Sequence, residues 1–283
     1  GFGMLNPLAR LALPKMVDKL KLWDFAAAQR PDYLLSISQE VQGRVQRYYK
    51  RESEVIYPPA SIEKFDEAKN KKDYFLVVSR LVPYKRVDLA VEACTRLGVK
   101  LVVAGKGPEL SRLKKLAGKN VEFVENPSDD KVSKLYSEAK GFIFSALEDY
   151  GITPVEAMAA GLPVICFDKG GATETVIDGK TGIYHDKQTV QSLIGAIQKF
   201  DKTKFDTKAI KQRAREFSEE KFLILLGAMD MGIPSKGFEQ NPLGFAKSFF
   251  KARNLTELNQ KFLQNVIFIY FFLRMVTLVQ SVQ

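Results

Sequence analysis

Residues 141–167 read GFIFSALEDYGITPVEAMAAGLPVICF, and this stretch decides the fold. It begins and ends with short apolar runs, GFIFSA at 141–146 and LPVICF at 162–167, on either side of a segment with helical spacing at 153–160. Strands that are apolar along their whole length are typical of a parallel sheet covered on both faces. The stretch therefore predicts one strand–helix–strand unit of an α/β domain.

The same alternation continues on both sides of this unit. Three more strand candidates precede it, at 74–79, 99–105 and 121–125. The amphipathic helical segments lie at 85–97, 109–118, 128–140, 187–199 and 206–220. We therefore expect an α/β fold, a doubly wound parallel sheet of the Rossmann-like kind, over residues 73–221.

The two ends of the chain follow other patterns. Upstream, YLLSIS (33–38) predicts a short strand, residues 39–50 a polar helix, and SEVIYPP a strand stopped by its two prolines. After Phe222 a turn-rich linker is expected, and then the apolar run VIFIYFFLRMVTLV, whose 14 residues fall short of the roughly 20 that a spanning helix needs. An interfacial helix, a partner-binding helix and sequence foreign to the domain all remain open for that run.

Composition narrows the partners without naming one. The chain has 283 residues, and its 43 Lys and Arg exceed its 33 Asp and Glu, for a formal charge of +10 scattered without a basic tract. Such a charge fits a nucleic acid, an anionic membrane face or a phosphorylated substrate. Cys94 and Cys166 lie far apart in apolar stretches, which predicts buried thiols in the reducing cytoplasm.

Two kinds of site are excluded by what the sequence lacks. His185 is the only histidine and lies beside a turn signal, where an exposed loop residue is expected, so a catalytic triad or a histidine metal site is disfavoured. The glycine-rich loop of P-loop NTPases is also absent.

The loop EDYGITPVE places two glutamates, Glu148 and Glu156, after a buried strand and at the start of a helix. Ligands of open α/β sheets bind at the carboxyl ends of the strands. Thr153 as N-cap, Pro154 at the first helical position and Glu156 in a capping box would explain the second glutamate structurally. Glu148 precedes the turn and has no such role, so its carboxylate suits sugar hydroxyls beside helix-start N–H groups that suit an anion.

A second candidate site is SRLVPYKRVD at residues 79–88, also after a strand. Arg80 and Lys85 flank a turn that contains proline, and together they could clamp a diphosphate. Surface salt bridges with Asp88 or Glu92 are the alternative. Taken together with Glu148 on a neighbouring loop, the clamp is the favoured interpretation.

Two glycine pairs also follow strands. Gly105 and Gly107 lack the third glycine of the dinucleotide fingerprint, so a NAD site is disfavoured, and they are expected to let the backbone turn closely beneath a ligand. Gly170 and Gly171 in DKGGATET are either a similar device or an ordinary turn.

These motifs together resemble glycosyltransferase family 4, retaining enzymes with the GT-B fold. The resemblance covers about residues 30–221 and is carried by EDYGITPVE, followed by AMAAGLPVI and GGATETV. SRLVPYKRVDLAVEA and the upstream segment look most like the mannosyltransferases of bacterial O-antigen and exopolysaccharide assembly.

The resemblance implies a chain organised around a donor-binding domain. Residues 1–72 would be the remnant of an N-terminal acceptor-side domain and its linker, 73–221 the donor-nucleotide-sugar-binding domain, and 222–283 an atypical tail. The chain opens on Gly-Phe-Gly without an initiating Met, so we expect it to be truncated at its N-terminus. Turnover by the isolated chain is then not expected even where donor binding survives.

The resemblance also assigns roles to the candidate residues. Arg80 and Lys85 would hold the diphosphate, Glu148 a hydroxyl of the donor sugar and Glu156 the ribose hydroxyls. The remaining donor-binding positions are backbone groups, at Gly105, Gly151, Ile152 and Thr153.

The expected reaction is transfer of a hexose, mannose from GDP-mannose, to a glycan or lipid-linked saccharide with retention of configuration. We expect no metal, no other cofactor and no nucleic-acid partner. A peripheral contact with the inner membrane face is expected. The alternatives are a non-catalytic nucleotide-sugar-binding module, an inactive fragment, and an epimerase on the same fold, for which the acids and histidines of proton transfer are lacking.

Overall fold

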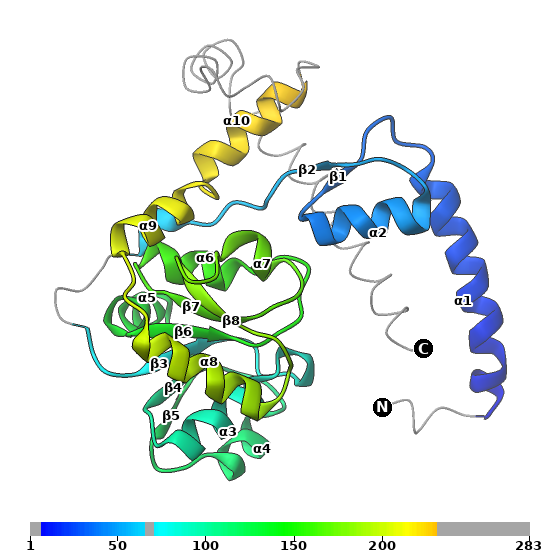
Figure 1. Cartoon of the computed structure of the whole chain (residues 1–283). Helices are drawn as coiled ribbons and strands as arrows, with labels where there is room; N and C mark the ends of the chain where they lie inside the picture. The colour runs from blue at the N-terminus through cyan, green and yellow to red at the C-terminus, as the bar shows by residue number, and fades with distance from the viewer. Residues whose placement is uncertain (1–6, 66–70, 231–283) are drawn as a thin grey trace. The chain divides into compact units, whose positions relative to one another are not determined.

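The computed structural model describes residues 7–65 and 71–230, which are drawn in colour in Figure 1. The chain forms two compact units. The described parts of the smaller unit are residues 7–34, 45–52 and 223–230. The larger unit holds residues 35–44, 53–65 and 71–222. The apolar run expected near the C-terminus lies outside the described residues.

The larger unit is built on a parallel sheet of six strands, in the order β5-β4-β3-β6-β7-β8. The strands are β3 (Phe75–Val78), β4 (Leu101–Gly105), β5 (Val121–Glu125), β6 (Gly141–Phe144), β7 (Val164–Phe167) and β8 (Gly182–His185). The chain proceeds outward from β3 to β5, returns to β6 beside β3, and then proceeds the other way. The doubly wound sheet expected from the sequence is therefore present, and its switch point lies between β3 and β6.

Helices cover both faces of this sheet (Figure 1). One face packs against α3 (Val87–Leu97), α4 (Leu110–Leu116) and α8 (Val190–Lys202). The other packs against α5 (Asp129–Glu138), α6 (Ile152–Ala159), α7 (Ala172–Thr175) and α9 (Thr207–Arg215). Consecutive strand residues alternate between the two cores, as Phe75 and Leu76 do, and both of these side chains are fully buried. This two-sided burial explains why β3, β4, β6 and β7 are apolar throughout.

Strand β8 was not expected, and it corrects the placement of His185. The histidine is the last residue of this strand and only 2% exposed, so the exposed loop residue expected from the sequence is wrong. The strand is short and follows directly on the turn signal at 178–182, which hides its apolar pattern. A Cβ on Gly182 would lie 2.0 Å from the carbonyl oxygen of Val164, so this glycine permits the close pairing of β7 and β8.

The remaining elements lie toward the chain ends. They are α1 (Pro7–Ala28), β1 (Leu35–Ser36), α2 (Gln39–Tyr49), β2 (Glu54–Val55), a 3-10 turn (Ile62–Lys64) and α10 (Glu219–Asp230). The turn-rich linker was expected at residues 227–244, and because α10 continues to Asp230, this expectation is wrong for residues 227–230. None of the helices in the described part of the chain is long and apolar enough to span a membrane.

Both cysteines are free and buried, as the sequence predicted. Burial raises the pKa of the Cys94 thiol to about 12 and also raises the pKa of Cys166. Both thiols are therefore protonated at neutral pH and act as small apolar core residues.

Candidate functional site

The candidate site lies where β3 and β6 end, at the switch point of the sheet. The loop after β3 carries Lys85, and the loop after β6 carries Glu148. Lys85 Nζ forms an ion pair with Glu148 Oε1, and the two side chains are only 17% and 20% exposed. The convergence of these two loops at one rim, expected from the sequence, is thus present.

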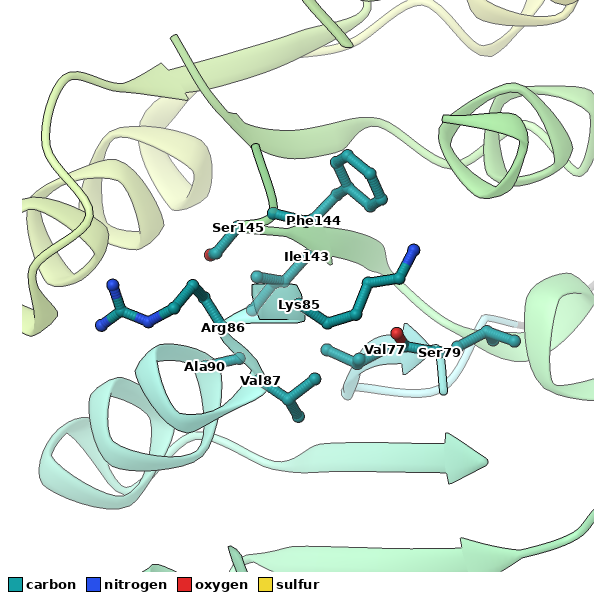
Figure 2. A pocket seen from close by; sticks show the side chains of 11 residues that line it. Val77, Ser79, Lys85, Arg86, Val87, Ala90, Ile143, Phe144 and Ser145 are labelled. Carbon is teal, nitrogen blue, oxygen red and sulfur yellow. The ribbon is translucent and has the colours of Figure 1, made fainter. Parts of the chain in front are cut away.

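The turn after β3 explains how Lys85 reaches that rim. Pro83 begins a 3-10 turn that ends at Lys85, and Arg86 then adopts the left-handed conformation (φ 50°, ψ 37°) from which α3 starts. Arg86 pairs with Asp88 through two contacts of 3.2 Å, so this extra charge has its own partner. The Lys85 and Arg86 side chains extend to opposite sides of the pocket in Figure 2.

Arg80 lies on the same loop but is exposed. Its Nη2 atom donates to the Tyr84 hydroxyl at 3.1 Å. Asp88 is paired with Arg86, and Glu92 with Arg96, so neither of the acids considered as surface partners is paired with Arg80 or Lys85 in a salt bridge.

The two glycines after β4 let the Arg80 loop approach closely. A Cβ on Gly105 would lie 1.9 Å from the Ser79 carbonyl oxygen, and one on Gly107 would lie 2.3 Å from that of Leu81. Leu81 N donates to Lys106 O at 2.8 Å, which fixes the loop against β4. Contacts within the protein itself therefore explain why glycine stands at positions 105 and 107.

The start of α6 differs from the expectation. Its N-cap is Gly151, at φ 117°, and the helix begins at Ile152, so Thr153 as N-cap and Pro154 at the first position are wrong. The capping box expected for Thr153 and Glu156 falls with them. Gly151 adopts a conformation that residues with a side chain avoid. The helix therefore begins directly after it, at Ile152 and before Thr153. The first N–H groups of α6 have no acceptor within the helix and lie directly after the Glu148 loop.

Glu156 instead contacts α5. The Tyr136 hydroxyl donates to Glu156 Oε2 at 3.1 Å. Burial raises the pKa of the Glu156 carboxyl above its ordinary 4.5, and the Tyr136 hydrogen bond opposes that rise. The favourable contribution of the neutral carboxyl is therefore present below pH 4.5 and is lost as the pH rises through the raised pKa.

We expect Tyr136→Phe to lower the free energy of unfolding by about 2 kcal/mol at pH 7 and by about half as much at pH 4. The lost bond is strongest when Glu156 is ionised, which explains the difference. Tyr74→Phe is the matched control, because the Tyr74 hydroxyl donates to the neutral Leu135 carbonyl at 2.9 Å. Urea unfolding at both pH values checks the prediction, and an equal loss for Tyr136→Phe at both would contradict it.

A small pocket of about 10 Å³ lies between the two loops (Figure 2). Lys85 and Arg86 line it from the β3 side and Phe144 and Ser145 from the β6 side. Ser145 is 4% exposed, and its hydroxyl has no hydrogen-bond partner among the residues that the structure describes. Within 7–65 and 71–230, no group of three His, Cys, Asp or Glu side chains could hold a metal ion.

Sequence reasoning missed three polar residues near this rim. They are Ser145, Asp149, which pairs with Arg44, and Glu174, which contacts residues 39, 40 and 57. Ser145 and Asp149 flank Glu148 in the sequence, and their nearness to it was the available signal. The partners of Glu174 lie more than a hundred positions away, where no local pattern could indicate them.

Comparison with known proteins places this site in a family. Residues 60–217 match the family described as glycosyl transferases group 1, and this match covers more than half of the chain. A GDP-mannose-dependent alpha-(1-6)-phosphatidylinositol monomannoside mannosyltransferase of Mycobacterium tuberculosis is 35% identical over 42% of this chain and 36% of its own length. Human alpha-1,3/1,6-mannosyltransferase ALG2 is 30% identical over 52% of this chain and 43% of its own length. The O-antigen chain mannosyltransferase RfbU of Salmonella typhimurium is 25% identical over 61% of this chain and 52% of its own length. The chain thus spans about half or less of these relatives.

Solved structures share the fold at lower identity. The sucrose-phosphate synthase of Thermosynechococcus elongatus superposes with a TM-score of 0.66 at 21% identity, over 76% of this chain and 61% of that one. Anabaena Alr3699/HepE in complex with UDP and glucose gives a TM-score of 0.65 at 19% identity, over 77% of this chain and 68% of that one. Both are neighbours of the GT-B type, which confirms the fold class expected from the sequence.

Proposed function

The chain belongs to the glycosyl transferases group 1 family, and from this premise we propose that it holds the nucleotide-sugar donor of a retaining hexosyltransferase of family 4. The proposed donor is GDP-mannose, and the proposed acceptor is a glycan or lipid-linked saccharide. The names of the relatives support this choice, since the mycobacterial, human and Salmonella proteins are all called mannosyltransferases.

The ion pair between Lys85 and Glu148 is the observation that carries the proposal. It places a cation and a carboxylate together, largely shielded from water, at the switch point where open α/β sheets bind ligands. A nucleotide sugar can replace both halves of the pair at once. Its phosphate oxygens accept from the Lys85 ammonium, and its sugar hydroxyls donate to the Glu148 carboxylate.

The same residues suit the charge changes of glycosyl transfer. Breaking the anomeric C–O bond leaves oxocarbenium character on the sugar and negative charge on the departing diphosphate. Lys85, Arg80 and the first N–H groups of α6 would meet that negative charge where it develops. One such donor is typically worth about 3–4 kcal/mol in the transition state.

Retention of configuration is part of the proposal and rests on the resemblance to family 4. The leaving phosphate would take the proton of the acceptor hydroxyl on the same face of the sugar, so no protein nucleophile is required. Glu148 then acts by binding the sugar.

Glu156 is proposed to bind the ribose hydroxyls. Tyr136 occupies Oε2 of this carboxylate, which leaves Oε1 for the ligand. Arg80 and Lys85 supply the positive charge at the diphosphate in this proposal, without a metal ion. A cytoplasmic location completes it, supported by the two free and buried thiols.

Titration calorimetry of the 283-residue chain with GDP-mannose, UDP-glucose, GDP and UDP tests the proposed function. We expect GDP-mannose to bind about tenfold more tightly than GDP, because only the sugar nucleotide has hydroxyls for Glu148. UDP-glucose is expected to bind more weakly than GDP-mannose. Equal affinities for GDP and GDP-mannose, or no saturable binding of any of the four, would contradict the proposal.

A further inference from the structure

The Glu174 carboxylate on α7 gathers three donors from a distant part of the same unit. It accepts from the backbone N–H groups of Gln39 at 2.7 Å and Glu40 at 3.0 Å, and from the Tyr57 hydroxyl at 3.0 Å. Gln39 and Glu40 are the first residues of α2, where the N–H groups lack intrahelical acceptors and the helix dipole favours an anion. Glu174 therefore holds the first turn of α2 and Tyr57 against α7.

The backbone around Glu174 is itself held in place. Arg213 on α9 donates to the carbonyl oxygens of Glu174 at 2.6 Å and Thr175 at 2.9 Å. The Arg213 guanidinium also lies over the Phe217 ring, 4.9 Å from its centroid. These contacts hold the end of α7 in place, and with it the Glu174 backbone.

The loop that leads into α7 is in close backbone contact with the Glu148 loop. Gly171 N donates to the Glu148 carbonyl oxygen at 2.8 Å. A Cβ on Gly170 would lie 2.5 Å from that oxygen, and one on Gly171 would lie 2.4 Å from the Asp149 carbonyl oxygen. The loop before α7 and the Glu148 loop are therefore in direct backbone contact, which links the position of Glu148 to that of α7.

A second link joins the two regions next to Glu148. Arg44 of α2 forms an ion pair with Asp149, with side chains 24% and 41% exposed. Residues 38–44 are thus tied to the Glu148 loop directly through Asp149 and indirectly through Glu174.

We propose that Glu174 is a positioning residue for donor-sugar binding. By holding the first turn of α2 and Tyr57, it sets the position of the Glu148 carboxylate, so that the hexose is bound tightly only when residues 38–44 and Tyr57 are docked on α7. The proposal rests on the proposed function, since it assigns to Glu148 the sugar of the donor. Free GDP lacks the hexose, so its affinity does not depend on this coupling.

The test compares the wild type, Glu174→Ala, Glu148→Ala and the double variant by calorimetry with GDP and GDP-mannose. The quantity measured is the ratio of the two dissociation constants, GDP to GDP-mannose. We expect Glu174→Ala to lower this ratio about 3- to 10-fold while the affinity for GDP stays unchanged. In the Glu148→Ala background the same substitution should change the ratio no further, because Glu174 acts through Glu148.

Two variants separate positioning from mere stability. Ser128→Ala is the control, since Ser128 Oγ accepts from Lys131 N at 3.3 Å and caps α5 instead of α2. It should lower the melting temperature and leave the ratio intact. Glu174→Gln keeps one oxygen, which can accept from two of the three donors, and should give a ratio between those of the wild type and Glu174→Ala.

The outcomes distinguish this inference from the proposed function. An unchanged ratio in Glu148→Ala would overturn the proposed function and the coupling with it. A lowered ratio in Glu148→Ala with no change in Glu174→Ala, or a further loss in the double variant, would overturn the coupling alone. An equal loss in Ser128→Ala would assign the effect of Glu174→Ala to a general loss of stability.

Discussion

Replacing Glu148 with alanine is expected to weaken GDP-mannose binding about 10- to 100-fold, because hydrogen bonds from sugar hydroxyls to a carboxylate are lost. Free GDP is expected to bind equally well or more tightly. In the wild type, Lys85 is paired with Glu148 and must leave that carboxylate to meet a phosphate. Without Glu148 the ammonium is available to the diphosphate, so the two ligands respond in opposite directions.

Glu138→Ala is the matched control for this substitution. Glu138 also pairs with a lysine, Lys72, at 2.6 Å, but that pair lies at the amino end of the sheet, before β3. Glu138→Ala removes the same charge as Glu148→Ala and should leave the affinities for GDP and GDP-mannose unchanged. Equal losses for GDP and GDP-mannose in Glu148→Ala would assign this carboxylate to another role.

Lys85→Ala is expected to weaken GDP and GDP-mannose alike, by about 100-fold. The variant loses a charge-assisted contact to the diphosphate and also leaves the Glu148 carboxylate unpaired beside an anion. The dependence of the affinity on salt should become shallower at the same time, since one cation at the phosphate is gone. Arg80→Ala should act in the same direction with a smaller effect, because Arg80 is exposed to solvent.

Calorimetry of Lys85→Ala and Lys72→Ala at two salt concentrations checks this prediction. Lys72 belongs to the ion pair at the amino end of the sheet and serves as the control. An unchanged affinity for GDP in Lys85→Ala, measured on protein with wild-type circular dichroism, would remove the clamp from the account.

The sheet was readable from the sequence because its strands are buried on both faces. Apart from the edge strand β5, whose Glu122 and Glu125 are exposed, the predicted strands give continuous apolar runs, and the glycines and amphipathic helices between the runs mark the crossovers. β8 was not predicted, since its first residue, Gly182, belongs to the turn signal at 178–182 and its last is a histidine. Burial against its neighbours decided its conformation, as the 2% exposure of His185 illustrates.

The candidate site was predictable in outline for a similar reason. Parallel strands bring their carboxyl ends to one edge, so residues that follow β3 and β6 must gather there. The local details at α6 were not predictable in this way. Thr153 and Pro154 suit a helix start, but Gly151 with φ 117° begins the helix before them.

The contacts of Glu174 lie beyond what a local pattern can indicate. Its partners Gln39 and Tyr57 are 135 and 117 positions away, and only the folded chain brings them together. For the glycines before it, the sequence left a ligand-approach device and an ordinary turn open, and their close packing on the Glu148 loop depends on backbone geometry that composition does not encode.

The most direct measurement is the structure of this chain with GDP-mannose bound. We predict that the Lys85–Glu148 ion pair separates in this complex. Lys85 Nζ and Arg80 should then contact the diphosphate, and the Glu148 carboxylate should lie within hydrogen-bonding distance of a mannose hydroxyl. A ligand bound elsewhere, or bound at this rim with the ion pair intact, would contradict it.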